Sequence, residues 1–324
     1  MTINVSRRMV LAALGAIVTK PSHSSVTWPT RPITLVIGVV PGGALDATAR
    51  IVAEGLSTRL GQQVVIESRP GAAGTIAAGY VARTAPDGYT LLAIPGTHAT
   101  TAAMYRKLPY RVMDDFSMIG MVSEYPFVMV TYAGHPIRTL ADLIRSARFQ
   151  KTPLLYGTPG VGSTHHLALE LFARMAKIKL QHIPYRGGAP AITDLLGRRL
   201  DFLIDTPATL LELVQVGRLR ALAVTGADRV SSLPDIPTIS EAGVSGYVVT
   251  SWQGLAASAG LPLALVERLN TEIANVLALP AVVERLTRLG NSPRPMGPDE
   301  FKARIAADIK KWTELMTAAN IDRI

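Results

Sequence analysis

The feature that most constrains this chain is a regular alternation of strand-like and helix-like segments. Strand-like segments carry apolar residues at every second position or in short β-branched runs, and helix-like segments carry them at a spacing of three and four. The first such segments are 33–39 (strand), 45–60 (helix, with Gly61 as its C-cap), 64–66 (strand), 75–83 (helix) and 89–94 (strand). A βαβαβ order is typical of a parallel sheet covered by helices, so we predict an α/β fold.

The same rhythm returns in the middle of the chain, and two extended apolar runs separate it from the rest. Strands are expected at 154–156, 180–183, 200–204 and 219–225, helices at 164–176 and up to Leu196, and three closing helices at 262–279, 281–289 and 299–319. The extended runs, 125–132 and 247–257, look like crossovers between two halves. We therefore expect two α/β lobes, one formed by 26–127 plus 250–324 and the other by 128–249, joined by paired hinge strands with a cleft between them.

The first 25 residues have the pattern of a secretory signal peptide. Arg7 and Arg8 precede an apolar run over 10–18, and a polar stretch with small residues ends near Ser22-His23-Ser24, a tolerable cleavage site. The apolar run is too short to span a bilayer; the alternative is an apolar N-terminal helix. The two arginines also resemble a twin-arginine signal, but we favour the Sec route. Either route predicts a periplasmic protein.

The charge and cysteine content narrow the possible partners. Loss of Arg7, Arg8 and Lys20 with the signal would lower the formal net charge from +9 to +6, and the remaining basic residues form no block or aromatic-interleaved stripe. Nucleic-acid binding is therefore not expected. The chain has no cysteine, which excludes disulfides, thiol catalysis, zinc-thiolate sites and a lipid anchor on an N-terminal cysteine. We expect a free monomer.

Ligands of open parallel sheets bind beyond the carboxyl ends of the strands. That rule selects the loops 41–46, 95–101, 158–166, 185–188 and 205–207. In the first loop, Gly42 and Gly43 let the backbone approach a ligand, and the following helix offers free N–H groups to an anion. Asp46 in the first helical turn can accept hydrogen bonds from loop amides or water. The alternative is an ordinary strand–helix turn with an acidic first turn.

The loop over 157–166 is the second candidate anion site. Ser163 or Thr164 can cap the following helix, and a carboxylate held between two helix N-termini is chemically sensible; the alternative is a tight turn with a capping residue. His165 and His166 are adjacent, so they do not share a helix face and do not form a metal motif; we expect structural or hydrogen-bonding histidines. Asp205 would recognise an ammonium or hydroxyl group if it faces the cleft, and is otherwise solvated.

No catalytic motif is present. The chain lacks a Gly-x-Ser-x-Gly elbow, a Walker A loop, a Gly-x-Gly-x-x-Gly fingerprint and paired acids of the kind used in glycoside hydrolysis. We therefore expect a binding protein with no catalytic residue, cofactor or metal.

Eight segments, in order, resemble one known family. They are Trp28 to Ile33, Pro41 to Asp46, Glu67 to Gly74, Ala85 to Leu91, Gly162 to Leu167, Pro184 to Ala191, Leu219 to Thr225 and Leu233 to Thr238. The chain resembles the extracytoplasmic solute receptors of tripartite tricarboxylate transporters, also called Bug receptors. The resemblance implies the type II periplasmic binding protein fold, capture of a small organic carboxylate, and transient delivery to membrane permease subunits.

The resemblance also implies the site. Backbone amides and ordered waters of the loop from Pro41 to Asp46 would hold the carboxylate, Ser163 to His166 would face it, and Asp205 would meet an amino or hydroxyl group. The expected ligand-binding residues are Pro41, Gly42, Gly43, Ala44, Asp46, Gly96, Thr97, Ser163, Thr164, His166 and Asp205. The chain departs from the family pattern at Ser68 and around Thr100-Thr101, where Asn is usual, and at Arg186, where Lys is usual.

Two other functions compete with transport. A receptor of this kind can instead present its liganded form to a membrane signalling partner, or the bilobal fold can carry an enzyme. Neighbouring permease genes would favour transport, and a neighbouring histidine kinase gene would favour sensing. Turnover of a carboxylate by the purified protein would favour the enzyme hypothesis. Dicarboxylates, tricarboxylates, amino acids and aromatic acids all fit a carboxylate anchor.

Overall fold

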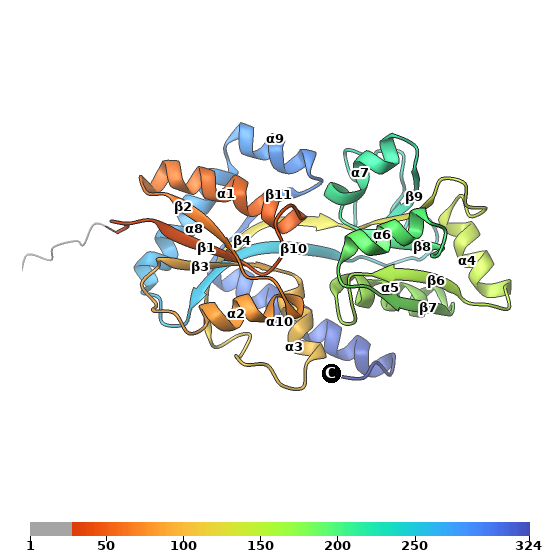
Figure 1. Cartoon of the computed structure of the whole chain (residues 1–324), viewed down its shortest axis with the longest axis horizontal. Coiled ribbons are helices and arrows are strands. Elements are labelled where there is room, and N and C mark those ends of the chain that lie inside the picture. Colours follow the sequence, from red (N-terminus) through yellow and green to blue (C-terminus); the bar gives the residue numbers. More distant parts are fainter. Residues whose placement is uncertain (1–27) are drawn as a thin grey trace, which may run out of the picture.

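The computed structural model describes residues 28–324, which form two lobes, each built around its own β-sheet (Figure 1). The predicted signal peptide, 1–25, lies outside the described residues. The strands are β1 (Ile33–Ile37), β2 (Val64–Ser68), β3 (Thr90–Pro95), β4 (Phe116–Pro126), β5 (Val128–Tyr132), β6 (Leu154–Thr158), β7 (Leu180–Pro184), β8 (Phe202–Asp205), β9 (Leu219–Val224), β10 (Thr250–Ser258) and β11 (Ser292–Met296). One sheet has the order β11-β4-β10-β3-β1-β2 and the other β7-β6-β8-β5-β9.

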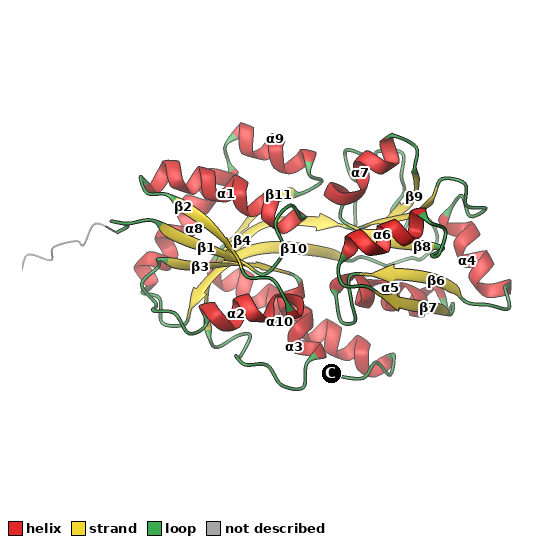
Figure 2. Cartoon of the chain, in the orientation of Figure 1, coloured by secondary structure: helices red, strands yellow, loops and turns green. Residues whose placement is uncertain are grey.

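Helices cover both faces of each sheet (Figure 2). They are α1 (Ala44–Leu60), α2 (Thr75–Val81), α3 (Thr97–Met104), α4 (Leu140–Phe149), α5 (Thr164–Ala176), α6 (Gly188–Leu196), α7 (Pro207–Gln215), α8 (Leu263–Leu277), α9 (Pro280–Arg288) and α10 (Pro298–Ala318), with a 3-10 turn η1 (Ala72–Gly74). The α/β prediction is confirmed. None of the helices among residues 28–324 is both long and apolar enough to span a bilayer.

Both sheets are mixed, because the chain leaves each lobe and comes back. Strand β1 pairs in parallel with β2 and β3, as the βαβαβ pattern predicts. Strand β10, returning from the other lobe, runs antiparallel between β3 and β4. In the second sheet β6 is parallel to β7 and β8, whereas β5 is antiparallel to β8 and β9.

The two passages between the lobes lie side by side. Strand β4 ends at Pro126 and β5 of the other sheet begins at Val128, so Phe127 is the only residue between them. The buried hydroxyl of Thr225 accepts a hydrogen bond from the Phe127 amide (2.8 Å) and donates to the carbonyl of Val249 (2.6 Å), which leads into β10. A single side chain therefore ties both hinge segments together. The residue boundaries predicted for the lobes stay a prediction.

Three apolar clusters fill the space between sheets and helices. One lies between the first sheet and α1, α8 and α9, and another lies between the second sheet and α6 and α7. The largest is continuous through both lobes, on the faces covered by α2, α3, α10, α4 and α5. Helix α10 reaches the second lobe, where Arg174 of α5 donates to the carbonyl of Ala318 (2.6 Å).

Several elements differ from the sequence prediction. Residues 95–101 were expected to form a loop, but α3 begins at Thr97. Its sequence lacks a clear apolar period, and the helix is instead buried by tertiary contacts with α10 and with the rings of Tyr110 and Phe116. Helices α4 and α7 and the edge strand β11, which contains two prolines, were not predicted.

Candidate functional site: a cleft between two glycine-rich loops

The loop between β1 and α1 presents uncapped backbone amides. Gly42 adopts a φ of +94°, and Gly43 is the N-cap of α1, which receives no side-chain capping bond. Glycine suits this turn because an L-residue with positive φ is strained. The free N–H groups of the first helical turn carry partial positive charge, so this part of lobe 1 can attract an anion.

Asp46 fixes this loop from within the first turn of α1. Its buried carboxylate accepts a hydrogen bond from the Gly42 amide (2.9 Å) and pairs with Arg50 (3.0 Å). Burial works to raise the pKa of Asp46, but the hydrogen bonds from Arg50 and from the Gly42 amide outweigh it and leave that pKa below its usual value. Asp46 is therefore ionised and acts by shaping the loop.

The loop between β3 and α3 packs against β10 and lies near the start of α5 in lobe 2. Gly96 donates to the carbonyl of Trp252 on β10 (2.9 Å). A Cβ added at Gly96 would lie 2.6 Å from the Ser251 hydroxyl and 3.7 Å from the Thr164 hydroxyl of lobe 2. A side chain at position 96 would therefore clash first with Ser251 of β10, whereas Thr164 across the cleft is at ordinary van der Waals distance. The Thr164 hydroxyl, at the start of α5, is buried without a hydrogen-bond partner.

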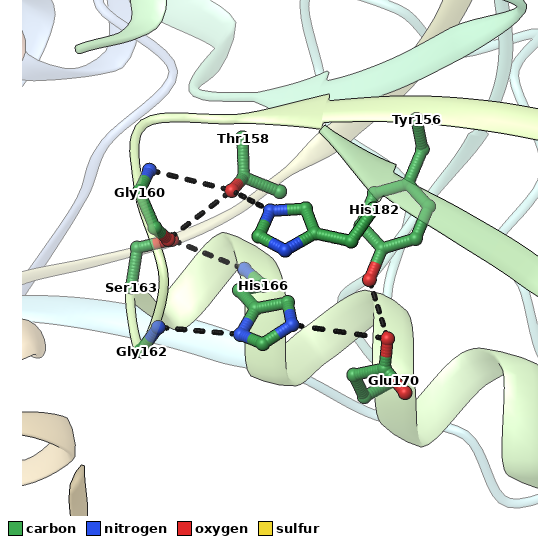
Figure 3. A network of polar contacts seen from close by, with 8 residues as sticks. All are labelled: Tyr156, Thr158, Gly160, Gly162, Ser163, His166, Glu170 and His182. Carbon is green, nitrogen blue, oxygen red and sulfur yellow. Dashed lines mark hydrogen bonds and ion pairs between the residues drawn. The ribbon is translucent and has the colours of Figure 1, made fainter. Parts of the chain in front are cut away.

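The facing loop of lobe 2 is held by a polar network (Figure 3). Ser163 caps α5 by accepting from the His166 amide (3.2 Å), and its hydroxyl donates to the Gly160 carbonyl (2.8 Å). The Nδ1 atom of His166 accepts from the Gly162 amide (3.2 Å). Thr158 accepts from the Gly160 amide (3.3 Å). The loop amides on this side are therefore positioned by side chains behind them.

Two histidine rings stack behind this loop. The rings of His166 and His182 are 4.0 Å apart at 17°, and the ring of Tyr156 stacks on His182 at 5.0 Å. Burial, together with the neighbouring His182, lowers the pKa of His166 to about 3, and burial lowers that of His182 to about 4. Both rings are neutral at pH 7. Since Nδ1 of His166 accepts a hydrogen bond, its proton is on Nε2, which lies 3.8 Å from Glu170.

His166 is thus a hydrogen-bonding residue that supports the loop. Among residues 28–324 no group of three or more His, Asp or Glu side chains is arranged to hold a metal ion.

Asp205 is buried at the end of β8, so the alternative of a solvated side chain is wrong. It accepts from the Thr206 amide (2.6 Å) and lies 3.6 Å from Nε2 of His165. Its second oxygen would be 2.6 Å from a Cβ added at Gly188, the first residue of α6. The His165 ring packs on Phe127 (4.3 Å), and neither ring nitrogen has a hydrogen-bond partner. A polar pair is therefore placed beside the hinge.

A cavity of about 260 Å³ opens between the lobes. Lobe 1 provides most of its wall, and Pro159, Ser163 and Gly187 close it from lobe 2. Its lining consists of Gly38, Val39, Leu45, Ala73, Gly74, Ala78, Leu92, Ala93, Ile94, Pro95, Thr97, His98, Thr101, Tyr110, Pro159, Ser163 and Gly187. A further cavity of about 300 Å³ lies at the hinge, between Tyr125, Asp228 and Asn291.

Only part of the predicted site lines the 260 Å³ cavity. Thr97 and Ser163 do, and Val39 and Leu45 connect it to the predicted loop. Pro41, Gly42, Gly43, Ala44, Asp46, Gly96, Thr164, His166 and Asp205 are not in its wall. The prediction missed the wall formed by 73–78 and Tyr110. The small-residue run Gly71-Ala72-Ala73-Gly74 follows β2, so the strand-end rule could have selected it.

Two α/β lobes joined by paired strands, with a cavity between loops at their strand ends, define the class of periplasmic solute-binding proteins. The chain matches the family described as Tripartite tricarboxylate transporter family receptor over residues 48–321. It belongs to that family, whose members are periplasmic solute-binding receptors rather than enzymes.

Relatives support this placement over nearly the whole chain. A Pseudomonas sp. (strain P51) relative, the UPF0065 protein in the tcbD-tcbE intergenic region, is 37% identical over 97% of this chain and 94% of its own length. Protein BugT of Bordetella pertussis is 34% identical, covering 89% of each chain.

Solved structures confirm the two-lobed fold. R. palustris Rpa4515 with adipate has a TM-score of 0.86 at 37% identity and covers 92% of this chain and 100% of its own. MatC (Rpa3494) from Rhodopseudomonas palustris with bound malate has a TM-score of 0.80 at 31% identity, covering 89% and 99%.

Proposed function

We propose that this receptor captures a small organic carboxylate in the cavity between its lobes and delivers it to a membrane permease. The observation that carries the proposal is the convergence of two glycine-rich helix N-termini, those of α1 and α5, near one cavity that both lobes line. Backbone amides at such ends bind anions without a cationic side chain. Because relatives have been solved with adipate and malate, a carboxylate is the anion that we expect this chain to bind.

Each predicted residue then has a role. The amides of Gly43 and Ala44 contact the carboxylate directly or through water, whereas Pro41 has no N–H to donate and shapes the turn. Asp46 holds the loop through its hydrogen bond from the Gly42 amide. Thr97, which lines the cavity, and the unpartnered hydroxyl of Thr164, which lies near Gly96, offer side-chain hydrogen bonds. Asp205 accepts from an amino or hydroxyl group where the ligand has one.

Binding is coupled to closure of the lobes about the hinge. The open form receives the ligand on the lobe 1 amides, and lobe 2 then brings Ser163 and Thr164 over it and excludes water. Each charge-assisted hydrogen bond contributes roughly 1.5–3 kcal/mol, so three or four support micromolar affinity after ordering costs. The closed form is the one that a permease recognises. The mature receptor is a periplasmic monomer released from its signal peptide.

A thermal-shift screen against organic acids, followed by calorimetry on the hits, tests the proposal. A ligand at a hundredfold excess over its dissociation constant stabilises the native state by about 2.7 kcal/mol, a clear rise in melting temperature. If no carboxylate raises the melting temperature of the purified mature chain, carboxylate capture is wrong. Ligand uptake by cells that lose the receptor gene, but not the permease genes, tests delivery.

A further inference from the structure

The 260 Å³ cavity has a half-buried mouth and a buried apolar interior. Val39, Thr97, Pro159, Ser163 and Gly187 are half-buried and surround the opening, next to the loops that present free amides. The interior is formed by Ala78, Leu92, Ile94 and Tyr110 of lobe 1, which are all buried. The large apolar side chains of the wall are therefore concentrated in the interior, beside the uncharged His98, Thr101 and Tyr110.

Two of the three polar side chains of the interior, Thr101 and His98, have hydrogen-bond partners within lobe 1. The Thr101 hydroxyl donates to the carbonyl of His98 (2.9 Å), and Nε2 of His98 lies 3.3 Å from the carbonyl of Val112. The His98 ring stacks on Tyr110 (6.0 Å, 3°). Burial lowers the pKa of His98 to about 4 and raises that of Tyr110 to about 12, so both are neutral at pH 7.

No residue in the wall of this cavity carries a charge at neutral pH. A ligand carboxylate placed in the interior would lose its hydration and find no cation there, which is strongly unfavourable. An apolar group in the same place would leave water for an apolar wall, which is favourable. The interior thus selects against a second charge.

We infer that the ligand is a monocarboxylate with an apolar aliphatic or aromatic body, its carboxylate at the mouth and its body in the interior. This inference rests on the proposed carboxylate-binding function. It sets the chain apart from its relatives solved with adipate and malate, because each of those ligands carries two carboxylates.

Calorimetry on the mature chain at pH 7 with four probes tests the inference. Hexanoate and benzoate represent aliphatic and aromatic bodies, and adipate and malate are the diacids. We expect hexanoate or benzoate to bind at least tenfold more tightly than both diacids. A diacid that binds as tightly as the better monocarboxylate overturns this inference and leaves carboxylate capture intact. If all four probes, and the wider acid panel, fail to bind, both proposals fail.

A matched pair of variants locates the body of the ligand. Val39→Phe narrows the mouth, whereas Val65→Phe places the same ring on the exposed side of edge strand β2, outside the cavity wall. We expect Val39→Phe to weaken binding of the better monocarboxylate at least tenfold, and Val65→Phe to change it less than twofold. Circular dichroism verifies folding of both. An unchanged affinity in folded Val39→Phe would place the ligand elsewhere and overturn the inference. If Val39→Phe does not fold, the comparison of the four probes on the parent chain tests the inference by itself.

Discussion

The two glycine-rich loops have the same local geometry but differ in chemistry. In each, a glycine with positive φ, Gly42 (+94°) or Gly162 (+74°), precedes the N-cap, and the third helical residue accepts the hydrogen bond of that glycine's amide. In lobe 1 the acceptor is the ionised carboxylate of Asp46, balanced by Arg50. In lobe 2 it is the neutral ring of His166, stacked on His182.

The comparison shows which property the turn requires and which it leaves free. An acceptor three residues into the helix is common to both loops, whereas charge is not. A carboxylate at a helix N-terminus offsets part of the positive end of the helix dipole, and a neutral imidazole does not. The end of α5 therefore keeps more of its attraction for an anion, while the α1 loop depends on Arg50 to restore the balance.

The largest effect is expected from removal of the charged acceptor. Asp46→Ala releases the Gly42 amide and leaves Arg50 unpaired. Because a charge-assisted hydrogen bond contributes roughly 1.5–3 kcal/mol, we expect ligand affinity to fall at least tenfold in calorimetry. Unchanged affinity would mean that this loop is not the anchor.

A matched control exists in α4, outside the cleft. Asp142 also accepts backbone hydrogen bonds at the third position of its helix, in a capping box with Thr139. Asp142→Ala should lower the melting temperature without changing affinity, because α4 lines no part of the 260 Å³ cavity. An equal loss of affinity in both variants would point to general loosening of the fold.

A smaller loss is expected from the neutral acceptor. His166→Ala removes the bond to the Gly162 amide and one ring of the stack. A neutral hydrogen bond contributes about 1 kcal/mol, so affinity should fall about fivefold. His166→Asp restores an acceptor but adds a negative charge at the end of α5. It should bind an anion no better than His166→Ala if attraction by that helix end matters.

The two supports should also respond differently to pH. The ring pKa values of His166 and His182 lie near 3 and 4 in the folded protein, below the ordinary value of about 6.5 that applies in the unfolded chain. Between about pH 4 and 6.5 the unfolded chain binds protons that the folded chain does not. The contribution of the two histidines to the free energy of unfolding is therefore fully present above this range and is lost as the pH falls through it.

Thermal melts at pH 7 and pH 5 measure this loss. We expect the melting temperature at pH 5 to be lower by at least about 2 °C, and by less in His182→Phe, which keeps an aromatic ring in the stack but cannot be protonated. The pKa of Asp46 lies below its usual value, so the lobe 1 support stays ionised over the same range. An identical pH response in His182→Phe would show that this histidine does not contribute.

The sequence revealed these loops but not what supports them. Helices α1 and α5 and the αL cap at Gly61 follow from local periodicity and glycine placement, and the strand-end rule selected both turns. His182, Tyr156 and Glu170 support the lobe 2 loop from other elements, so no local pattern indicates them. The lobe 1 support is visible only because Asp46 and Arg50 are one helical turn apart.

The cavity was harder to predict for the same reason. Its interior combines α2, the end of β3 and Tyr110, which meet only in the folded lobe. Helix α3 is not visible in the apolar pattern because its buried residues include His98, Thr100 and Thr101 beside Ala99, Ala103 and Met104, and it is stabilised by tertiary packing on α10 and on the Tyr110 and Phe116 rings. Polar loops were therefore easier to find than the apolar space behind them.

The smallest effect is expected from Arg50, and it decides whether acceptor geometry or charge balance matters more in lobe 1. The Arg50 side chain is 56% exposed, so water and salt screen its pairing with Asp46. In Arg50→Gln the Gly42 amide keeps its acceptor, and we expect affinity to change less than fivefold, with a weaker dependence on salt than in the parent chain. Calorimetry at low and high salt measures both. If Arg50→Gln binds as poorly as Asp46→Ala, charge balance governs the lobe 1 loop, and the likeness between the two turns is one of shape alone.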